Sequence, residues 1–294
     1  MGSSVLRPRE RLGRELRSLR VLAGLTGPQL AEAMGVTQSR VSRLETAKYR
    51  VDLDTVQRWL EATSADEATR DRVLALAREA ATEVAEYRSI FRGSLFNAQQ
   101  ALIQQEAAAR RLRHFQPYQI PGPFQTAAYA RVALQSGRVQ DLAGLDEAVT
   151  ARIERGERLR GPDAPEYHAV LTELALRYRP IETTDKDREA AWRRLADLAE
   201  LPNVTVQIIP ADAPMRQAAM CAFLITEFRD PAESTIVQVE LPAVEMTFTG
   251  ADDLAAFETA WQRMVDAALG PQQSRQFLAD LLRSSVSRPA RRSG

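Results

Sequence analysis

A run of hydrogen-bonding side chains between residues 37 and 43, TQSRVSR, has the residue types that can contact the edges of nucleic-acid bases. Glutamine can pair with adenine through two hydrogen bonds, arginine can pair in the same way with guanine, and serine can donate or accept at either base. We expect base contacts from Gln38, Ser39 and Arg43, supported by Arg40 and Ser42. A helix face that is merely solvated more often carries glutamate and lysine, whereas this run contains no acidic residue.

Two short helices would place these side chains on one surface. Leu30 and Met34 are spaced i, i+4 and give the first helix an apolar stripe. Val41 and Leu44 are spaced i, i+3 and fix the buried face of the second helix. At 100° per residue, the polar side chains of the second helix then point outward or lie on its flanks.

The residues between these helices are typical of a tight turn. Gly35 stands where the backbone often requires a positive φ, which favours glycine. Thr37 is a good N-cap for the second helix. The pattern therefore predicts a helix-turn-helix over residues 25–50, with an ordinary pair of packed helices as the alternative interpretation.

Phosphate contacts are expected at the edges of this motif. We assign them to Thr26, which precedes the first helix, and to Lys48 and Arg50, because the end of a recognition helix lies near the DNA backbone. Residues 1–60 hold an excess of five basic over acidic residues, so the local field favours phosphate although the whole chain has zero net charge. Three arginines of the preceding helix are either solvated or contact phosphate: Arg14, Arg17 and Arg20.

Residues 9–62 resemble the XRE (Cro/cI-like) helix-turn-helix family. The matching stretches are Leu25-Thr26, Leu30-Ala31, Gly35-Val36, Thr37-Gln38-Ser39 and Val41-Ser42-Arg43-Leu44-Glu45. The resemblance implies a sequence-specific DNA-binding transcriptional regulator. Two positions depart from the family pattern. Gly27 replaces a glutamine that contacts phosphate, and Ala47 replaces the glycine that ends the recognition helix, so the end of this helix must be capped in another way.

The composition is that of an ordinary globular protein. The chain has 294 residues, which favours two domains, and 45% of them are apolar. It has no apolar run long enough to span a bilayer, and no signal-peptide pattern at its start. A single cysteine, Cys221, excludes an internal disulfide, and we expect a cytoplasmic protein with no membrane association.

No pattern in the sequence predicts an enzyme. The chain lacks a G-x-S-x-G elbow, a phosphate-binding glycine loop and an H-E-x-x-H motif. Its two histidines, His114 and His168, lie far from Cys221 in the sequence, and we interpret both as structural or solvated. We therefore expect no catalytic residues, no metal site and no cofactor.

The apolar patterns divide the chain into three parts: a DNA-binding domain at residues 1–84, an α+β domain at 85–283 and a disordered basic tail at 284–294. The predicted fold is mostly α-helical, with an N-terminal five-helix bundle followed by helices packed on a small antiparallel sheet. Residues 98–115 predict one long helix, and the proline-rich residues 116–124 exclude a regular helix. The first helix is expected to bury its apolar residues, Leu12, Leu16, Leu19, Val21 and Leu22.

The second domain, over about residues 86–282, resembles the C-terminal domain of actinobacterial regulators of the WhiJ/Scr antitoxin-like type. The matching segments are Gln105–Ala108, Tyr118–Thr126 with Tyr129-Ala130, Thr172–Arg177 and Leu201–Gln207. This resemblance implies a small protein partner encoded by a neighbouring gene. The chain differs at residues 181–184, where the family commonly has a glycine pair, and at residues 240–249.

These observations predict a transcriptional regulator that binds double-stranded DNA as a homodimer. One short recognition helix reads few base pairs, so two half-sites about 34–36 Å apart would supply the specificity. The second domain would then dimerise and bind the small partner protein. Two alternatives remain open: an antitoxin-like protein that chiefly sequesters its partner, and a regulator that senses a small molecule in a pocket framed by residues 117–124 and the sheet.

Overall fold

The computed structural model describes residues 8–47, 51–86, 95–136, 144–180, 182–214, 221–240 and 244–286. The chain divides into two compact units. Unit 1 comprises residues 1–84 and 246–256, and unit 2 comprises residues 85–245 and 257–294. Residues 246–256, which the sequence pattern predicts in the second domain, belong instead to the N-terminal unit.

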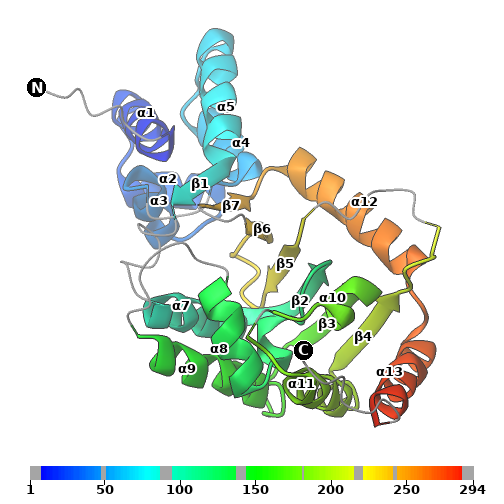
Figure 1. Cartoon of the computed structure of the whole chain (residues 1–294). Coiled ribbons are helices and arrows are strands. Elements are labelled where there is room, and N and C mark those ends of the chain that lie inside the picture. Colours follow the sequence, from blue (N-terminus) through cyan, green and yellow to red (C-terminus); the bar gives the residue numbers. More distant parts are fainter. Residues whose placement is uncertain are drawn as a thin grey trace, which may run out of the picture. The chain divides into compact units, whose positions relative to one another are not determined.

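Unit 1 contains the five expected helices, coloured blue to cyan in Figure 1. They are α1 (Pro8–Leu22), α2 (Gly27–Met34), α3 (Gln38–Glu45), α4 (Leu53–Ala62) and α5 (Glu67–Ala81). One apolar core joins them, and it includes Leu30, Val41 and the fully buried Trp59. The indole of Trp59 also donates a hydrogen bond of 3.0 Å to the carbonyl of Leu16, which ties α4 to α1.

The end of α1 differs from the prediction. Val21 and Leu22 are 60% and 80% exposed, although both were expected in the buried stripe. Leu12 and Leu16 do lie in the core. At about 100° per residue, Val21 points about 180° away from Leu12, so it cannot share the face that α1 buries.

Unit 2 alternates helices and strands along the chain. Its helical elements are α7 (Leu95–Ala108), the 3-10 turn η1 (Gly122–Phe124), α8 (Ala127–Ser136), α9 (Leu145–Arg158), α10 (Glu173–Arg177), α11 (Asp185–Leu198) and α13 (Pro271–Val286). The strands are β2 (Ala109–Gln116), β3 (Glu166–Thr172), β4 (Val204–Ile209), β5 (Phe223–Phe228) and β6 (Ile236–Glu240). Because α13 continues to Val286, the predicted disordered tail cannot begin at residue 284.

Three elements contain the residues at which the chain passes from one unit to the other. They are β1 (Thr82–Glu86), β7 (Val244–Phe248) and α12 (Ala251–Ala267). Helix α12 begins in unit 1, and from Phe257 onward it belongs to unit 2. No helix of the described residues is long and apolar enough to cross a membrane.

The sheet of unit 2 is mixed rather than antiparallel. Its strands follow the order β6-β5-β2-β3-β4, in which β2, β3 and β4 are parallel and β5 and β6 run antiparallel to their neighbours. Helices α8 and α9 connect β2 to β3, and α10 and α11 connect β3 to β4. A helical crossover returns the chain to the same end of the sheet, which makes successive strands parallel. The α+β class of the second domain is confirmed, and the all-antiparallel sheet is wrong.

Strand β2 also replaces half of the long helix predicted for residues 98–115. Its alanines and arginines favour a helix, but β2 pairs with β3 on one side and with β5 on the other. Leu112 and Phe115 are both buried, and they lie in apolar contacts on different faces of the sheet. Pairing on both sides and burial on both faces outweigh the local helix propensity.

Helices cover both faces of this sheet. One face carries the largest apolar core, which combines Leu112 and Tyr167 with residues of α8, α11 and α13. On the other face, Trp261 of α12 packs against His168 and Phe223, with ring centroids 4.9 and 6.5 Å apart. The edge strand β4 is covered by the chain before α13, because Gln207 donates to the carbonyl of Leu269.

Candidate nucleic-acid interface

Local hydrogen bonds build the helix-turn-helix as the sequence predicts. Thr26 and Gln29 form a reciprocal capping box at the start of α2, and Gly35 ends this helix with φ at 65°. Thr37 caps α3, because its hydroxyl accepts a hydrogen bond of 3.3 Å from the amide of Arg40. These caps satisfy helix-terminal groups without help from distant parts of the chain.

Four of the five predicted base-contacting side chains lie on the exposed face of α3. Gln38, Ser39, Ser42 and Arg43 are exposed, whereas Val41 and Leu44 are buried in the core. The guanidinium of Arg43 lies near the helix surface, with Nε 3.4 Å from the carbonyl oxygen of Ser39. The four side chains therefore form a polar surface along one short helix.

The fifth predicted residue, Arg40, does not belong to this surface. Only 9% of Arg40 is exposed, and its Nη2 donates to Asp52 Oδ2 at 3.0 Å and to Thr55 Oγ1 at 2.8 Å. Asp52 is also the N-cap of α4. Arg40 thus joins the recognition helix to α4. The sequence spacing already indicates that Arg40 lies on the buried face, because Arg40 stands four residues before the buried Leu44.

The structure describes one of the three residues predicted to contact phosphate, Thr26. Thr26 is exposed, and its hydroxyl donates to Gln29 Oε1 at 2.8 Å, so it caps α2 at the surface. Lys48 and Arg50 lie outside the described residues. Gly27 lies beside the start of α3, since a Cβ at this position would stand 3.7 Å from Gln38 Nε2. The amino ends of α2 and α3 therefore meet near Gln38.

The recognition helix ends without a glycine, as the substitution at residue 47 predicts. Ala47 itself adopts the left-handed conformation, with φ at 56°. Thr46 is the C-cap residue, and its hydroxyl donates to the carbonyl of Ser42 at 2.8 Å. A left-handed backbone is unfavourable for a residue with a Cβ, so this end of α3 contains local strain.

Helix α1 holds the same end of α3 in place. Arg20 forms a two-pronged ion pair with Glu45, with Nε–Oε1 and Nη2–Oε2 distances of 2.5 and 3.1 Å. It also donates to the carbonyl of Leu25 at 2.8 Å. Hydrogen bonding to Glu45 raises the pKa of Arg20, so the guanidinium is charged. Arg20 is therefore neither simply solvated nor available for phosphate, and its spacing from Glu45 in the sequence gave no sign of this.

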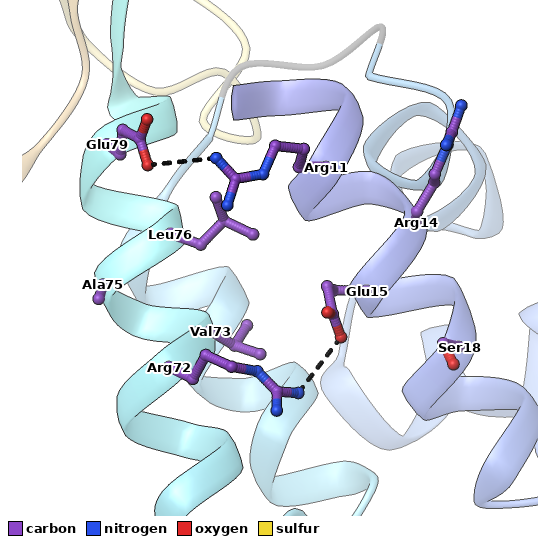
Figure 2. A pocket seen from close by; sticks show the side chains of 9 residues that line it. All are labelled: Arg11, Arg14, Glu15, Ser18, Arg72, Val73, Ala75, Leu76 and Glu79. Carbon is purple, nitrogen blue, oxygen red and sulfur yellow. Dashed lines mark hydrogen bonds and ion pairs between the residues drawn. The ribbon is translucent and has the colours of Figure 1, made fainter. Parts of the chain in front are cut away.

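A groove of about 570 Å³ lies between α1 and α5 of unit 1 (Figure 2). Ion pairs cross it between Arg72 and Glu15 at 3.4 Å and between Arg11 and Glu79 at 3.9 Å. Both are solvent-exposed pairs, which contribute little to stability. The charges lining the groove are largely paired with one another, so it offers no concentrated charge for a ligand.

Unit 2 contains the two histidines and the single cysteine of the chain. His114 is partly buried, and its Nδ1 lies 2.7 Å from the hydroxyl of Tyr167. Burial, assisted by the charge of Arg155, lowers the pKa of His114 to about 3, so the ring is neutral near pH 7. Burial also lowers the pKa of His168 and raises that of Cys221. The described residues contain no group of three potential metal ligands.

A buried ion pair fixes the proline-rich segment of unit 2. Arg155 of α9 contacts both carboxylate oxygens of Glu106, at 2.9 and 2.5 Å, and donates to Gln99 Oε1 at 2.8 Å. Gly122 approaches this guanidinium closely, since a Cβ there would lie 3.4 Å from Arg155 Nη1. The Gln105–Ala108 and Tyr118–Thr126 segments of the second resemblance therefore meet around a structural pair.

Comparison with known proteins gives two family matches. Residues 99–280 match a family described as a domain of unknown function (DUF5753), and residues 11–73 match a helix-turn-helix domain. The second match confirms a helix-turn-helix domain at the N-terminus and thus a DNA-binding regulator; it does not distinguish the XRE subtype. No curated protein sequence matches the chain.

Two solved structures are similar to parts of the chain. The clp gene regulator ClgR from C. glutamicum is 32% identical, with 27% of this chain and 97% of that chain covered and a TM-score of 0.22. TrmBL2, an archaeal chromatin protein with a novel mode of DNA binding, is 14% identical, with 87% and 92% covered and a TM-score of 0.29. At these TM-scores neither structure supports a detailed comparison.

Proposed function

This chain belongs to the DUF5753 family and has a helix-turn-helix domain, and we propose that it is a sequence-specific transcriptional regulator of the XRE type. The observation that supports this proposal most directly is the exposed face of α3. Gln38, Ser39, Ser42 and Arg43 present there the donors and acceptors that base edges recognise. We leave Arg40 out of this set because its guanidinium is engaged by Asp52 and Thr55.

The contacts to the DNA backbone would come from the rim of the motif. Thr26 stays exposed while it caps α2, and the amino end of that helix carries a partial positive charge. Lys48 and Arg50 remain proposed phosphate contacts on the strength of the sequence.

We also propose that the protein acts as a homodimer on two related half-sites. Helix α3 has eight residues and can reach only a few base pairs, so one copy would discriminate weakly among genomic sites. Two copies bound about 34–36 Å apart would multiply that discrimination.

Unit 2 is proposed to bind a small partner protein, following the WhiJ/Scr resemblance. It has its own apolar core, and it exposes the large side chains Tyr118, Leu174 and Tyr178, which can contribute apolar contact area. We propose no catalytic role and no cofactor. The pKa of His114 is lowered to about 3, so the ring is neutral and poorly suited to proton transfer near pH 7.

The decisive experiment selects duplexes from a random DNA library with the purified full chain and measures their affinity. We expect an enriched sequence with two related half-sites, and Arg43→Ala should weaken binding to it. Affinity capture from the native host, with mass spectrometry, tests the partner. An absence of enriched sequences together with a stoichiometric small protein would instead favour a sequestering, antitoxin-like role.

A further inference from the structure

Thr249 attaches a segment from the C-terminal half of the sequence to the DNA-binding unit. Its hydroxyl oxygen lies 2.6 Å from the carbonyl oxygen of Val51 and 3.1 Å from that of Ala81. Its amide donates a second hydrogen bond of 3.1 Å to Ala81. Thr249 is only 5% exposed. These bonds join Thr249 to residues 198 and 168 positions earlier in the chain, and buried hydrogen bonds of this kind are costly to break.

Val51 directly precedes the residues that hold the recognition helix. Asp52, the next residue, accepts hydrogen bonds from Arg40 Nη2 at 3.0 Å and from Thr55 Oγ1 at 2.5 Å. Val51 is itself buried in the core of unit 1. A displacement of the Val51 carbonyl would therefore shift the Asp52 carboxylate and, with it, the guanidinium of Arg40 in α3.

The segment that contains Thr249 continues into unit 2 as one helix. Helix α12 starts at Ala251 and extends to Ala267 without interruption. Within unit 2, its Trp261 is 5% exposed and packs edge-on against His168. The segment that bonds to Val51 and Ala81 is therefore covalently continuous with the part of α12 that packs within unit 2.

We propose that residues 246–256 are a positioning element of the DNA-binding unit, and that Thr249 is the residue through which this segment sets the placement of helix α3. Thr249 is a positioning residue, since it acts on the DNA-reading surface through Val51, Asp52 and Arg40. The expected change in DNA affinity rests on the proposed function, whereas the expected change in amide hydrogen exchange does not depend on it.

The test uses the full chain with three single substitutions. Thr249→Val keeps the shape of the side chain and removes the hydroxyl, and Thr249→Ser keeps the hydroxyl. Thr247→Val is the matched control two residues earlier in β7. Each protein is measured for affinity to a duplex that the unsubstituted protein selects from a random library, and for amide hydrogen exchange in α3 and residues 51–56.

We expect Thr249→Val to weaken DNA binding by at least about fivefold, the lower end of typical coupling between sites. Exchange should rise in α3 and at residues 51–56 and stay unchanged in β2 and β3. Thr249→Ser should restore both readouts, and Thr247→Val should match the unsubstituted protein. Combination with Thr55→Val should be non-additive, because both substitutions act on Asp52.

Unchanged DNA affinity together with unchanged hydrogen exchange in Thr249→Val would overturn the proposal. The proposal would also fail if the free-energy effects of Thr249→Val and Thr55→Val simply added in the double variant. Loss of structure in both units would also contradict it, because a positioning role is confined to unit 1. If the unsubstituted protein selects no duplex, the proposed function fails, and the exchange data still decide whether Thr249 positions α3.

Discussion

Gly13 of α1 lies against the carboxyl end of the recognition helix: a Cβ at residue 13 would stand 2.7 Å from the carbonyl oxygen of Glu45. The carbonyl oxygen of Leu44 would be 2.8 Å away. Both distances are shorter than a carbon and an oxygen can approach without displacement. The absence of a side chain at residue 13 thus allows α1 to pack on the end of α3, next to the ion pair of Arg20 and Glu45.

Gly13→Ala should therefore destabilise the protein, although alanine ordinarily favours a helix by about 1 kcal/mol over glycine. We expect a loss of about 1–3 kcal/mol, because the obstacle is backbone and can be relieved only by moving a helix. Denaturant unfolding measures it, with Ser18→Ala on the exposed side of α1 as the control. A more stable Gly13→Ala variant would show that α1 and α3 do not approach this closely.

Ala47→Gly should stabilise the protein by about 1 kcal/mol. Ala47 adopts a φ of 56°, a conformation that costs a residue with a Cβ about 1–2 kcal/mol and glycine almost nothing. The control is Ala33→Gly, an exposed position inside α2, where the same change should cost up to about 1 kcal/mol. Thermal unfolding distinguishes the two cases, and equal losses at both positions would contradict the left-handed end of α3.

Substitution by alanine should mainly affect DNA binding at Arg43 and mainly affect stability at Arg40. Arg43→Ala should cost about 1–3 kcal/mol of binding to the selected duplex with little change in stability or in affinity for unrelated DNA. Arg40→Ala should lower the stability by about 1–3 kcal/mol, because it removes the guanidinium that donates hydrogen bonds to both Asp52 and Thr55. Parallel titrations with selected and unrelated duplexes, together with unfolding curves, check both. Equal losses on all DNA sequences would reassign Arg43 to phosphate contact.

His114 should make the protein less stable in acid. Its pKa is lowered to about 3 in the folded chain, so the unfolded chain binds the proton first as the pH falls below about 6.5. The stability contributed by the neutral ring is present above that pH and is lost progressively down to about pH 3, with about 2 kcal/mol lost at pH 5. His114→Gln should flatten this part of the profile. Unfolding free energies at pH 7, 6 and 5 measure the change, and parallel profiles for both proteins would exclude it.

The sequence predicts best those features that depend on neighbouring residues. The caps at Thr37 and Gly35 and the exposed face of α3 follow from helical spacing and backbone preference, and the structure confirms them. Arg40 could have been placed correctly from its i, i+4 relation to Leu44. Residue type alone favours guanine contact for an arginine in this helix, whereas the spacing places Arg40 on the buried face.

Features that depend on distant residues were not predictable. Residues 109–116 have the composition of a helix, and only pairing with β3 and β5 makes them a strand. The Arg20–Glu45 pair and the Thr249–Val51 bond connect positions 25 and 198 residues apart. Sequence spacing contains no information on such contacts when a single chain is read alone.

Unit 1 is built from two separate stretches of the chain. This arrangement also affects the order in which the unit folds during synthesis. About 160 residues separate residue 84 from residue 246, so a ribosome must translate for roughly 8–30 s after α5 emerges before the last part of unit 1 is available. During that interval, the carbonyls of Val51 and Ala81 lack their native partner. The nascent DNA-binding unit therefore completes its folding only after most of unit 2 has been made.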